Sequence, residues 1–290
     1  MSAAAESRSP AVPRPASMLS ILHLSDLHFG RPAVPAHIEA VERLVQEARF
    51  DVVAVSGDLS QRARAGEFQR AAVFLRDAGR VSRTIVVPGN HDVMWWRAPL
   101  GIGDDSALYE HWRHYVAPEL EPVLRLPEAT FVGLNTAQGV LPQTLTWNVR
   151  DISIIGHLTR RQIDRAAAAF AEGPPGAARI VVMHHNPVKG ELSQRHGLKN
   201  TPKILGAFAE MGVDLILCGH DHQEAIHFVE HTRKGTVIST AGTVSNRSRG
   251  GRPSSANVIT VRRDAIEITT HVWSREAQRF EPGQHHCFAR

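Results

Sequence analysis

Cysteine and long hydrophobic runs are both scarce in this sequence of 290 residues. Two cysteines, Cys218 and Cys287, cannot build a disulfide scaffold, and such low usage fits a reducing compartment. No window approaches about 18 uninterrupted apolar residues, which excludes a transmembrane helix. Residues 1–16 are rich in Ala, Ser and Pro and lack the apolar segment of a secretory signal. We therefore expect a soluble, cytoplasmic protein with no membrane partner, and its true start is left open between Met1 and Met18.

A strong charge of one sign is missing as well. The formal net charge is +4 and the isoelectric point is near 9.5, which gives only a mild preference for anionic partners. The dense basic stripe of a dedicated DNA-binding protein is absent, so we do not expect a nucleic-acid partner. With 42% hydrophobic and 21% charged residues, the composition is that of a globular protein. A chain of this length buries enough surface to fold without disulfides or metal ions.

Short apolar runs alternate with amphipathic helical patterns along much of the chain. Buried strands are predicted at residues 19–24, 52–55, 84–87, 180–183 and 214–218. Helices are predicted at residues 38–48, 68–78, 159–171 and 202–211. This alternation predicts an α/β fold.

The pattern changes after Cys218. Four candidate strands follow without helices between them, at residues 226–230, 236–240, 257–261 and 266–271. We expect them to form a second, mostly antiparallel sheet. Residues 248–255 are predicted to form a loop, and the stretch from 93 to 178 has no assigned role.

Histidine is abundant, with 17 residues, and metal-binding side chains follow each of the first five strands. The side chains in question are Asp26 and His28; Asp58; Asn90, His91 and Asp92; His184 and His185; and His220 and His222. In open α/β sheets the loops beyond the carboxyl ends of the strands converge on one crevice, so these residues are expected to meet there. Turn formation would account for the Gly, Asn and Asp residues but not for the histidines.

The five blocks resemble the signature of the calcineurin-like metallophosphoesterases, in this order: Asp26-x-His28, Gly57-Asp58, Gly89-Asn90-His91-Asp92, His184 and Gly219-His220-x-His222. The blocks reach from residue 26 to residue 222. The resemblance implies a four-layer α-β-β-α sandwich in which two mixed sheets are flanked by helices. It also implies a disordered extension at 1–17, a catalytic domain at 18–275 and a C-terminal tail at 276–290.

The resemblance implies a set of ligands for each of two metal ions. One ion would be held by Asp26, His28 and His222, the other by Asn90, His184 and His220, and Asp58 would bridge both. This mixture of carboxylate, amide and imidazole ligands suits Mn, Fe, Zn or Co. Two such ions could share a hydroxide that attacks phosphorus.

Further residues receive roles by the same resemblance or by position. His91 would stabilise the transition state or protonate the leaving group. Asp92 would either fix the His91 ring by a hydrogen bond or cap a helix. His185 is expected at the rim of the site, where it could contact the substrate. Trp95 and Trp96 follow the third block, and one of them could stack on a nucleobase, although both could instead pack under the loop.

The expected substrate is a small phosphodiester. Protein phosphatases of this family carry Asp-Arg-Gly after the second block, where this chain has Leu59-Ser60-Gln61, and the lipid pyrophosphatases have arginine in place of His91. The chain is more similar to the class III cyclic nucleotide phosphodiesterases, so 3′,5′-cyclic AMP is the first expectation. The alternatives are a broad phosphodiesterase for glycerophosphodiesters or 2′,3′-cyclic nucleotides, a DNA-repair-type nuclease, and, least favoured, a scaffold without activity. A homodimer is left open.

Overall fold

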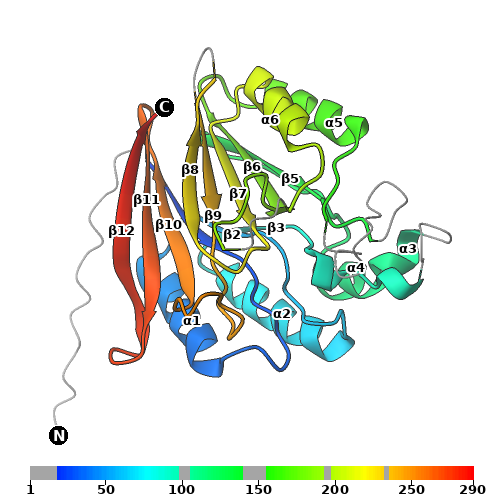
Figure 1. Ribbon diagram of the computed structural model, residues 1–290, viewed down its shortest axis with the longest axis vertical. Coiled ribbons are helices and arrows are strands. Elements are labelled where there is room, and N and C mark those ends of the chain that lie inside the picture. The colour runs from blue at the N-terminus through cyan, green and yellow to red at the C-terminus, as the bar shows by residue number, and fades with distance from the viewer. Residues whose placement is uncertain (1–17, 98–104, 140–154, 193–196, 232–234) are drawn as a thin grey trace, which may run out of the picture.

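The computed structural model describes residues 18–97, 105–139, 155–192, 197–231 and 235–290, so the predicted extension at 1–17 lies outside the described residues. Two six-stranded sheets lie between two groups of helices (Figure 1). None of the helices in these ranges has both the length and the apolar character needed to cross a membrane.

The first sheet has the order β12-β11-β10-β1-β2-β3. Its strands are β1 (Leu19–Leu24), β2 (Val52–Val55), β3 (Arg83–Val86), β10 (Ser255–Val261), β11 (Ala265–Ser274) and β12 (Arg279–Ala289). Strands β1, β2 and β3 run parallel, whereas β10 pairs with β1 in the antiparallel sense, with Leu19 opposite Val261. The sheet is therefore mixed.

The second sheet has the order β4-β5-β6-β7-β9-β8. Its strands are β4 (Val123–Arg125), β5 (Ala129–Leu134), β6 (Ala178–His185), β7 (Leu215–Gly219), β8 (Ala225–Val229) and β9 (Thr236–Thr240). The four inner strands are parallel and the two edge strands are antiparallel to their neighbours. This sheet is also mixed.

Helices cover the outer face of each sheet. The helices are α1 (Pro35–Ala48), α2 (Ala65–Ala78), α3 (Asp105–Leu108), α4 (Glu110–Tyr115), α5 (Arg160–Ala171) and α6 (Thr201–Glu210), with the 3₁₀ turns η1 (Asn90–Asp92) and η2 (Trp95–Arg97). Figure 1 shows α1 and α2 on one side of the molecule and α5 and α6 on the other.

Three apolar clusters hold the layers together. One lies between the sheets and includes Ile21 and Val52 of the first sheet with Phe131 and Ile180 of the second. A second joins the first sheet to α1 and α2, and a third joins the second sheet to α5 and α6. Alternate residues of a strand face opposite sides, so each central strand must be apolar on both faces, which produces the continuous hydrophobic runs of the sequence. The predicted four-layer α-β-β-α fold is confirmed.

One prediction about the sheets is wrong, and one inner strand was not predicted. The strands after Cys218 do not form a separate antiparallel sheet, because β8 and β9 extend the second sheet whereas β10, β11 and β12 extend the first. Strand β5, inside the stretch from 93 to 178, was not predicted, although all six of its residues are buried. β5 lies between β4 and β6 in the second sheet, and the five strands that carry the metal-binding residues belong to two sheets rather than one.

The predicted C-terminal tail also differs from the structure. Residues 279–289 form β12, which pairs along β11 at the edge of the first sheet, with Phe288 opposite Ile266. Phe280 is buried against Trp273 and His37, which anchors this strand to α1. Polar residues on an edge strand face solvent, and this explains why the segment has the composition of a tail.

Candidate metal centre

The loops after β1, β2, β3, β6 and β7 meet where the two sheets adjoin. The backbone N–H of His28 donates to the carbonyl of Asp58 (2.9 Å), so the first two loops run side by side. Sharp bends turn the side chains into the centre, because five residues have left-handed backbone angles with φ between 45° and 73°: Asp26, His28, Asp58, His220 and His222. Such angles are unfavourable for residues other than glycine and are found preferentially at functional sites.

One cluster contains Asp26, His28, Asp58 and His222. The Nε2 atom of His222 lies 3.0 Å from Oδ1 of Asp26 and 3.1 Å from Nε2 of His28. All four side chains are buried, and their ligand atoms point at one another. Two imidazole nitrogens and two carboxylate oxygens gathered at one point form a ligand set that suits a divalent metal ion.

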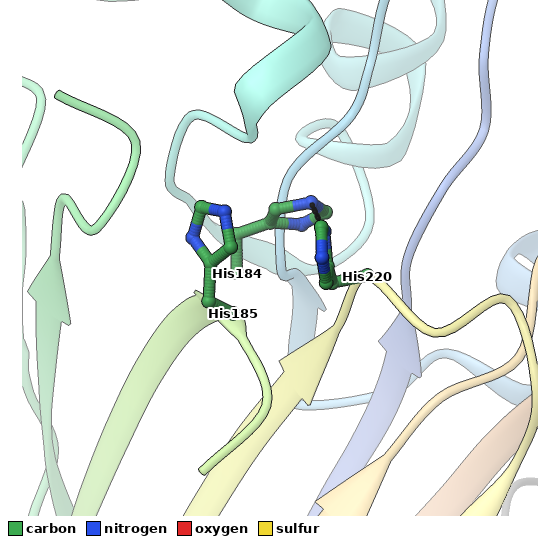
Figure 2. Close-up of side chains that lie close together, drawn as sticks. All are labelled: His184, His185 and His220. Carbon is green, nitrogen blue, oxygen red and sulfur yellow. Dashed lines mark hydrogen bonds between the residues drawn. The ribbon is translucent and has the colours of Figure 1, made fainter. Parts of the chain in front are cut away.

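A second cluster is formed by His184, His220 and Asn90. Oδ1 of Asn90 lies 3.1 Å from Nε2 of His184 and 3.1 Å from Nδ1 of His220. Figure 2 shows the rings of His184 and His220 turned toward each other from the ends of β6 and β7. The other nitrogen of His184, Nδ1, contacts the carbonyl of Ser56 (2.8 Å), which orients the ring as a second-shell bond does for a metal ligand.

Asp58 lies between the two clusters. Its Oδ2 atom is 3.7 Å from Nε2 of His28 and 3.4 Å from Nε2 of His184. Among the seven predicted ligands, Asp58 is the carboxylate whose position matches a bridge between two ions.

Electrostatics favour positive charge at this place. Burial opposes ionisation of Asp26 and Asp58, but the surrounding histidines hold the pKa of both carboxyls well below the usual range. Burial also opposes a charge on His184, yet the Asp58 carboxylate raises its pKa to about 9. Burial and the neighbouring His184 lower the pKa of His220 to about 3.

The residues present fit two metal ions. Asp26 Oδ1 and Asp58 Oδ2 are buried and have no hydrogen-bond partner in the described part of the chain, although they face imidazole nitrogens. An ion at each cluster would satisfy these oxygens with the ligand types that Mn, Fe, Zn and Co accept. Gly89 leaves room for the bridge, since a Cβ there would stand 2.1 Å from Oδ1 of Asp58.

His91 lies beside the clusters, half-buried. Its backbone N–H donates to Oδ1 of Asp58 (2.9 Å), and its Nδ1 contacts the carbonyl of Gln61 (2.8 Å). A carbonyl only accepts, so Nδ1 carries the proton and Nε2 is the acceptor of the neutral ring. Burial lowers the pKa of His91, although the negative charge of Asp58 acts in the opposite direction.

Asp92 does not play the predicted role toward His91. Its carboxylate accepts the backbone N–H groups of Leu59 (3.1 Å), Ser60 (2.7 Å) and Gly89 (3.0 Å), whereas the His91 ring is held by Gln61. The bond to Gly89 belongs to a capping box on η1 in which Gly89 is the N-cap residue and Asp92 the last residue of the turn, so the alternative expectation of Asp92 as a helix N-cap is also wrong. The remaining bonds join the loop after β3 to the loop after β2. Burial and the neighbouring Asp58 raise the pKa of Asp92 to about 7.

His185 is not at the rim. It is only 1% exposed, and its Nδ1 contacts the hydroxyl of Thr136 (2.7 Å) behind the second cluster. Its ring nevertheless lies beside those of His184 and His220, with ring centroids 5.0 Å and 4.6 Å away, and these three histidines form a group that could hold a metal ion (Figure 2).

Trp95 and Trp96 are 39% and 50% exposed, so they do not both pack under the loop. They line a cleft of about 650 Å³ together with Asn90 and His91. Tyr109 and Trp112 of the same region are buried. The structure thus separates a core pair of aromatic residues from an exposed pair beside the candidate metal centre.

Sequence reasoning missed Arg247 and Gln61. Nη1 of Arg247 lies 3.1 Å from Nε2 of His91 and 3.2 Å from Oε1 of Gln61. Arg247 follows β9, which is parallel to β7, so its loop emerges at the same edge of the sheet as His220. Loops beyond the carboxyl ends of parallel strands converge on one crevice, so this loop would have been included if β9 had been assigned to the parallel sheet.

Comparison with known proteins identifies relatives of this fold. The family model for calcineurin-like phosphoesterases matches residues 19–224. A curated protein of Psychrobacter arcticus, named "Probable cyclic nucleotide phosphodiesterase", is 26% identical over 248 residues, which cover 79% of this chain and 81% of that protein.

Two solved structures share the architecture at low sequence identity. The purple acid phosphatase PPD1 of yellow lupin has a TM-score of 0.65 at 12% identity over 95% of this chain, which spans 54% of the lupin chain, about half its length. GAP50, described as the anchor in the inner membrane complex of Plasmodium, has a TM-score of 0.60 at 13% identity, covering 94% of this chain and 89% of that one. At these identities the likeness concerns the fold alone.

Proposed function

This chain belongs to the calcineurin-like phosphoesterase family, and on that premise we propose that it hydrolyses phosphodiesters with two metal ions and that 3′,5′-cyclic AMP is its substrate. The ions would be held by Asp26, His28 and His222 on one side and by Asn90, His184 and His220 on the other, with Asp58 shared. Ions at such ligands activate water as a nucleophile and neutralise charge on the phosphate oxygens.

The protein's own side chains would supply orientation and a proton. Nε2 of His91 lies on the side of the ring away from Gln61, where it contacts Nη1 of Arg247 (3.1 Å). Protonation at Nε2 would turn this atom from an acceptor into a donor for the departing alkoxide. Asp92 would keep the loops of Asp58 and Asn90 in register through its three backbone bonds. Neither Ser nor Cys is needed as a nucleophile in this scheme. The chain's free buried thiol, Cys218, has its pKa raised to about 12 by burial and is not reactive.

The observation that carries the choice of substrate is the cleft shared by Asn90, His91, Trp95 and Trp96. It puts two exposed indoles next to the residues expected to handle the phosphate. A nucleobase can stack on an indole at about 1 to 3 kcal/mol, whereas a glycerol group cannot. The name of the Psychrobacter relative supports the same choice.

A comparison of three substrates tests this proposal. The metal-loaded protein is assayed with bis-p-nitrophenyl phosphate, with p-nitrophenyl phosphate and with cyclic AMP. We expect hydrolysis of the diester and of cyclic AMP, with AMP as the product, and much slower hydrolysis of the monoester. Turnover of the monoester alone would refute the diesterase proposal. Turnover of the aryl diester without cyclic AMP would leave the broad phosphodiesterase as the better description.

A further inference from the structure

An arginine from outside the five blocks reaches the candidate metal centre. Nη1 of Arg247 lies 3.1 Å from Nε2 of His91, 3.2 Å from Oε1 of Gln61 and 3.5 Å from Nε2 of His28. These three partners come from three different loops. The guanidinium is therefore placed between a predicted metal ligand and the predicted proton donor.

The loop that carries Arg247 is tied to the site itself. The hydroxyl of Thr243 donates to the backbone carbonyl of Asp26 (2.6 Å) and contacts the hydroxyl of Ser245 (2.7 Å). Ser245 Oγ in turn accepts the backbone N–H of Arg247 (3.3 Å), and Asn246 donates to the carbonyl of Pro32 (2.9 Å). This chain of bonds fixes the arginine relative to a metal ligand, as a preorganised binding residue requires.

The contacts of Arg247 leave its positive charge unneutralised. Its partners are an amide oxygen and two imidazoles, and in the described ranges no carboxylate is within 4.0 Å of it. The loop's other arginines behave differently: Arg252 pairs with Glu191 (2.8 Å) and Arg249 approaches Asp221 (3.9 Å). A half-buried guanidinium without a counter-ion, turned into a site, is suited to an anion.

We propose that Arg247 is a substrate-binding residue whose guanidinium binds a non-bridging oxygen of the phosphate that is hydrolysed. All three observed contacts use Nη1, so the remaining N–H groups of the guanidinium are available to a planar pair of phosphate oxygens. This assignment rests on the proposed function for its substrate, a phosphodiester, but the affinity for phosphate can be measured separately from turnover.

The test uses inorganic phosphate as the probe and the metal-loaded full chain. Its affinity is measured by titration calorimetry and as competitive inhibition of diester hydrolysis, for the wild type and for Arg247→Ala, Arg247→Lys and Arg249→Ala. We expect Arg247→Ala to weaken phosphate binding and to raise KM by about 10- to 100-fold, the size of a hydrogen bond to a charged group. The phosphate affinity of Arg247→Lys should lie between those of the wild type and Arg247→Ala, because lysine keeps the charge but not the planar guanidinium.

Arg249→Ala is the matched control and should bind phosphate as the wild type does. Metal content and thermal stability are measured in parallel and should be unchanged in Arg247→Ala. Wild-type phosphate affinity in Arg247→Ala would overturn the proposal, and so would a loss of metal together with phosphate, since that would show a structural role. A wild-type protein that binds phosphate through Arg247 but leaves diesters intact would refute the proposed function and not this assignment.

Discussion

Nδ1 of His23 lies 3.1 Å from the hydroxyl of Ser239, and this fully buried contact joins β1 of the first sheet to β9 of the second. Nε2 of His23 contacts the hydroxyl of Ser56 (3.0 Å), next to the loop that carries Asp58. Asn257 donates to the same Ser239 hydroxyl (2.9 Å), so this hydroxyl can give its own proton to Nδ1. The neutral imidazole is thus fully bonded in the layer between the sheets.

This environment makes stability depend on pH. Burial lowers the pKa of His23 from 6.5 to about 3, so between these values the unfolded chain binds a proton that the folded chain does not. The free energy of unfolding should therefore fall as pH drops through this window, by up to about 1.4 kcal/mol per pH unit from this group. Denaturant titrations of the chelator-treated wild type and of His23→Gln at several pH values check this. The free energy of unfolding should depend less steeply on pH in the variant than in the wild type. Parallel curves would contradict this account.

Asp92 is expected to be a positioning residue. Asp92→Ala would leave the buried N–H groups of Leu59, Ser60 and Gly89 without their acceptor, at a cost of about 1 to 3 kcal/mol for each. We expect the free energy of unfolding and the metal affinity to fall together. Denaturant titration and metal titration measure both. The control is Asp164→Ala, which removes an exposed pair with Arg160 and should change little. Equal behaviour of the two variants would refute the role.

His91 should act on the chemistry and not on the metals. His91→Ala is expected to keep both ions but to lower kcat by about 10² to 10⁴, the usual contribution of a general acid. The loss should shrink for aryl diesters, whose leaving groups need no proton. Rates across a series of leaving groups, with metal content measured in parallel, check this. If the variant loses metal, His91 is a ligand and its assigned role is wrong.

The exposed indoles should distinguish nucleotides from simple diesters. Trp95→Ala or Trp96→Ala is expected to raise KM for cyclic AMP about tenfold, equivalent to about 1.4 kcal/mol and within the range for base stacking. Hydrolysis of bis-p-nitrophenyl phosphate should barely change. Phe228, which is 42% exposed on β8 and lies outside the cleft, provides the control Phe228→Ala. Equal losses on both substrates, or no loss on either, would rule out stacking.

The ligand residues could be predicted from sequence because each lies at, or a few residues beyond, the carboxyl end of a short apolar strand. The runs at 19–24, 52–55 and 236–240 match β1, β2 and β9 to the residue, since strands that are buried on both faces leave continuous hydrophobic stretches. The sequence of a strand carries no comparable signal for which of the two sheets the strand joins. Strand β9 and the antiparallel strand β10 have similar composition, yet the loop 241–254 between them crosses from one sheet to the other.

Roles that depend on a contact across the fold were beyond the sequence for the same reason. Arg247 lies in a loop rich in Ser, Gly and Arg, and nothing in its neighbours separates it from Arg249 or Arg252. Bonds across the fold, such as that of Thr243 to Asp26, hold the loop where Arg247 meets His91. His185 does lie beside His184, as its place in the chain suggested, but the sequence did not show that its ring is buried against Thr136 rather than exposed at the rim.

The central claim is that Asp58 bridges two metal ions, and the number of ions bound per chain tests it most directly. Metal content is measured by elemental analysis of the reconstituted wild type and of Asp58→Ala, with Asp164→Ala as the control. We predict two ions and diester hydrolysis in the wild type and the control, and one ion or none, without turnover, in Asp58→Ala. Two bound ions and wild-type activity in Asp58→Ala would contradict the account.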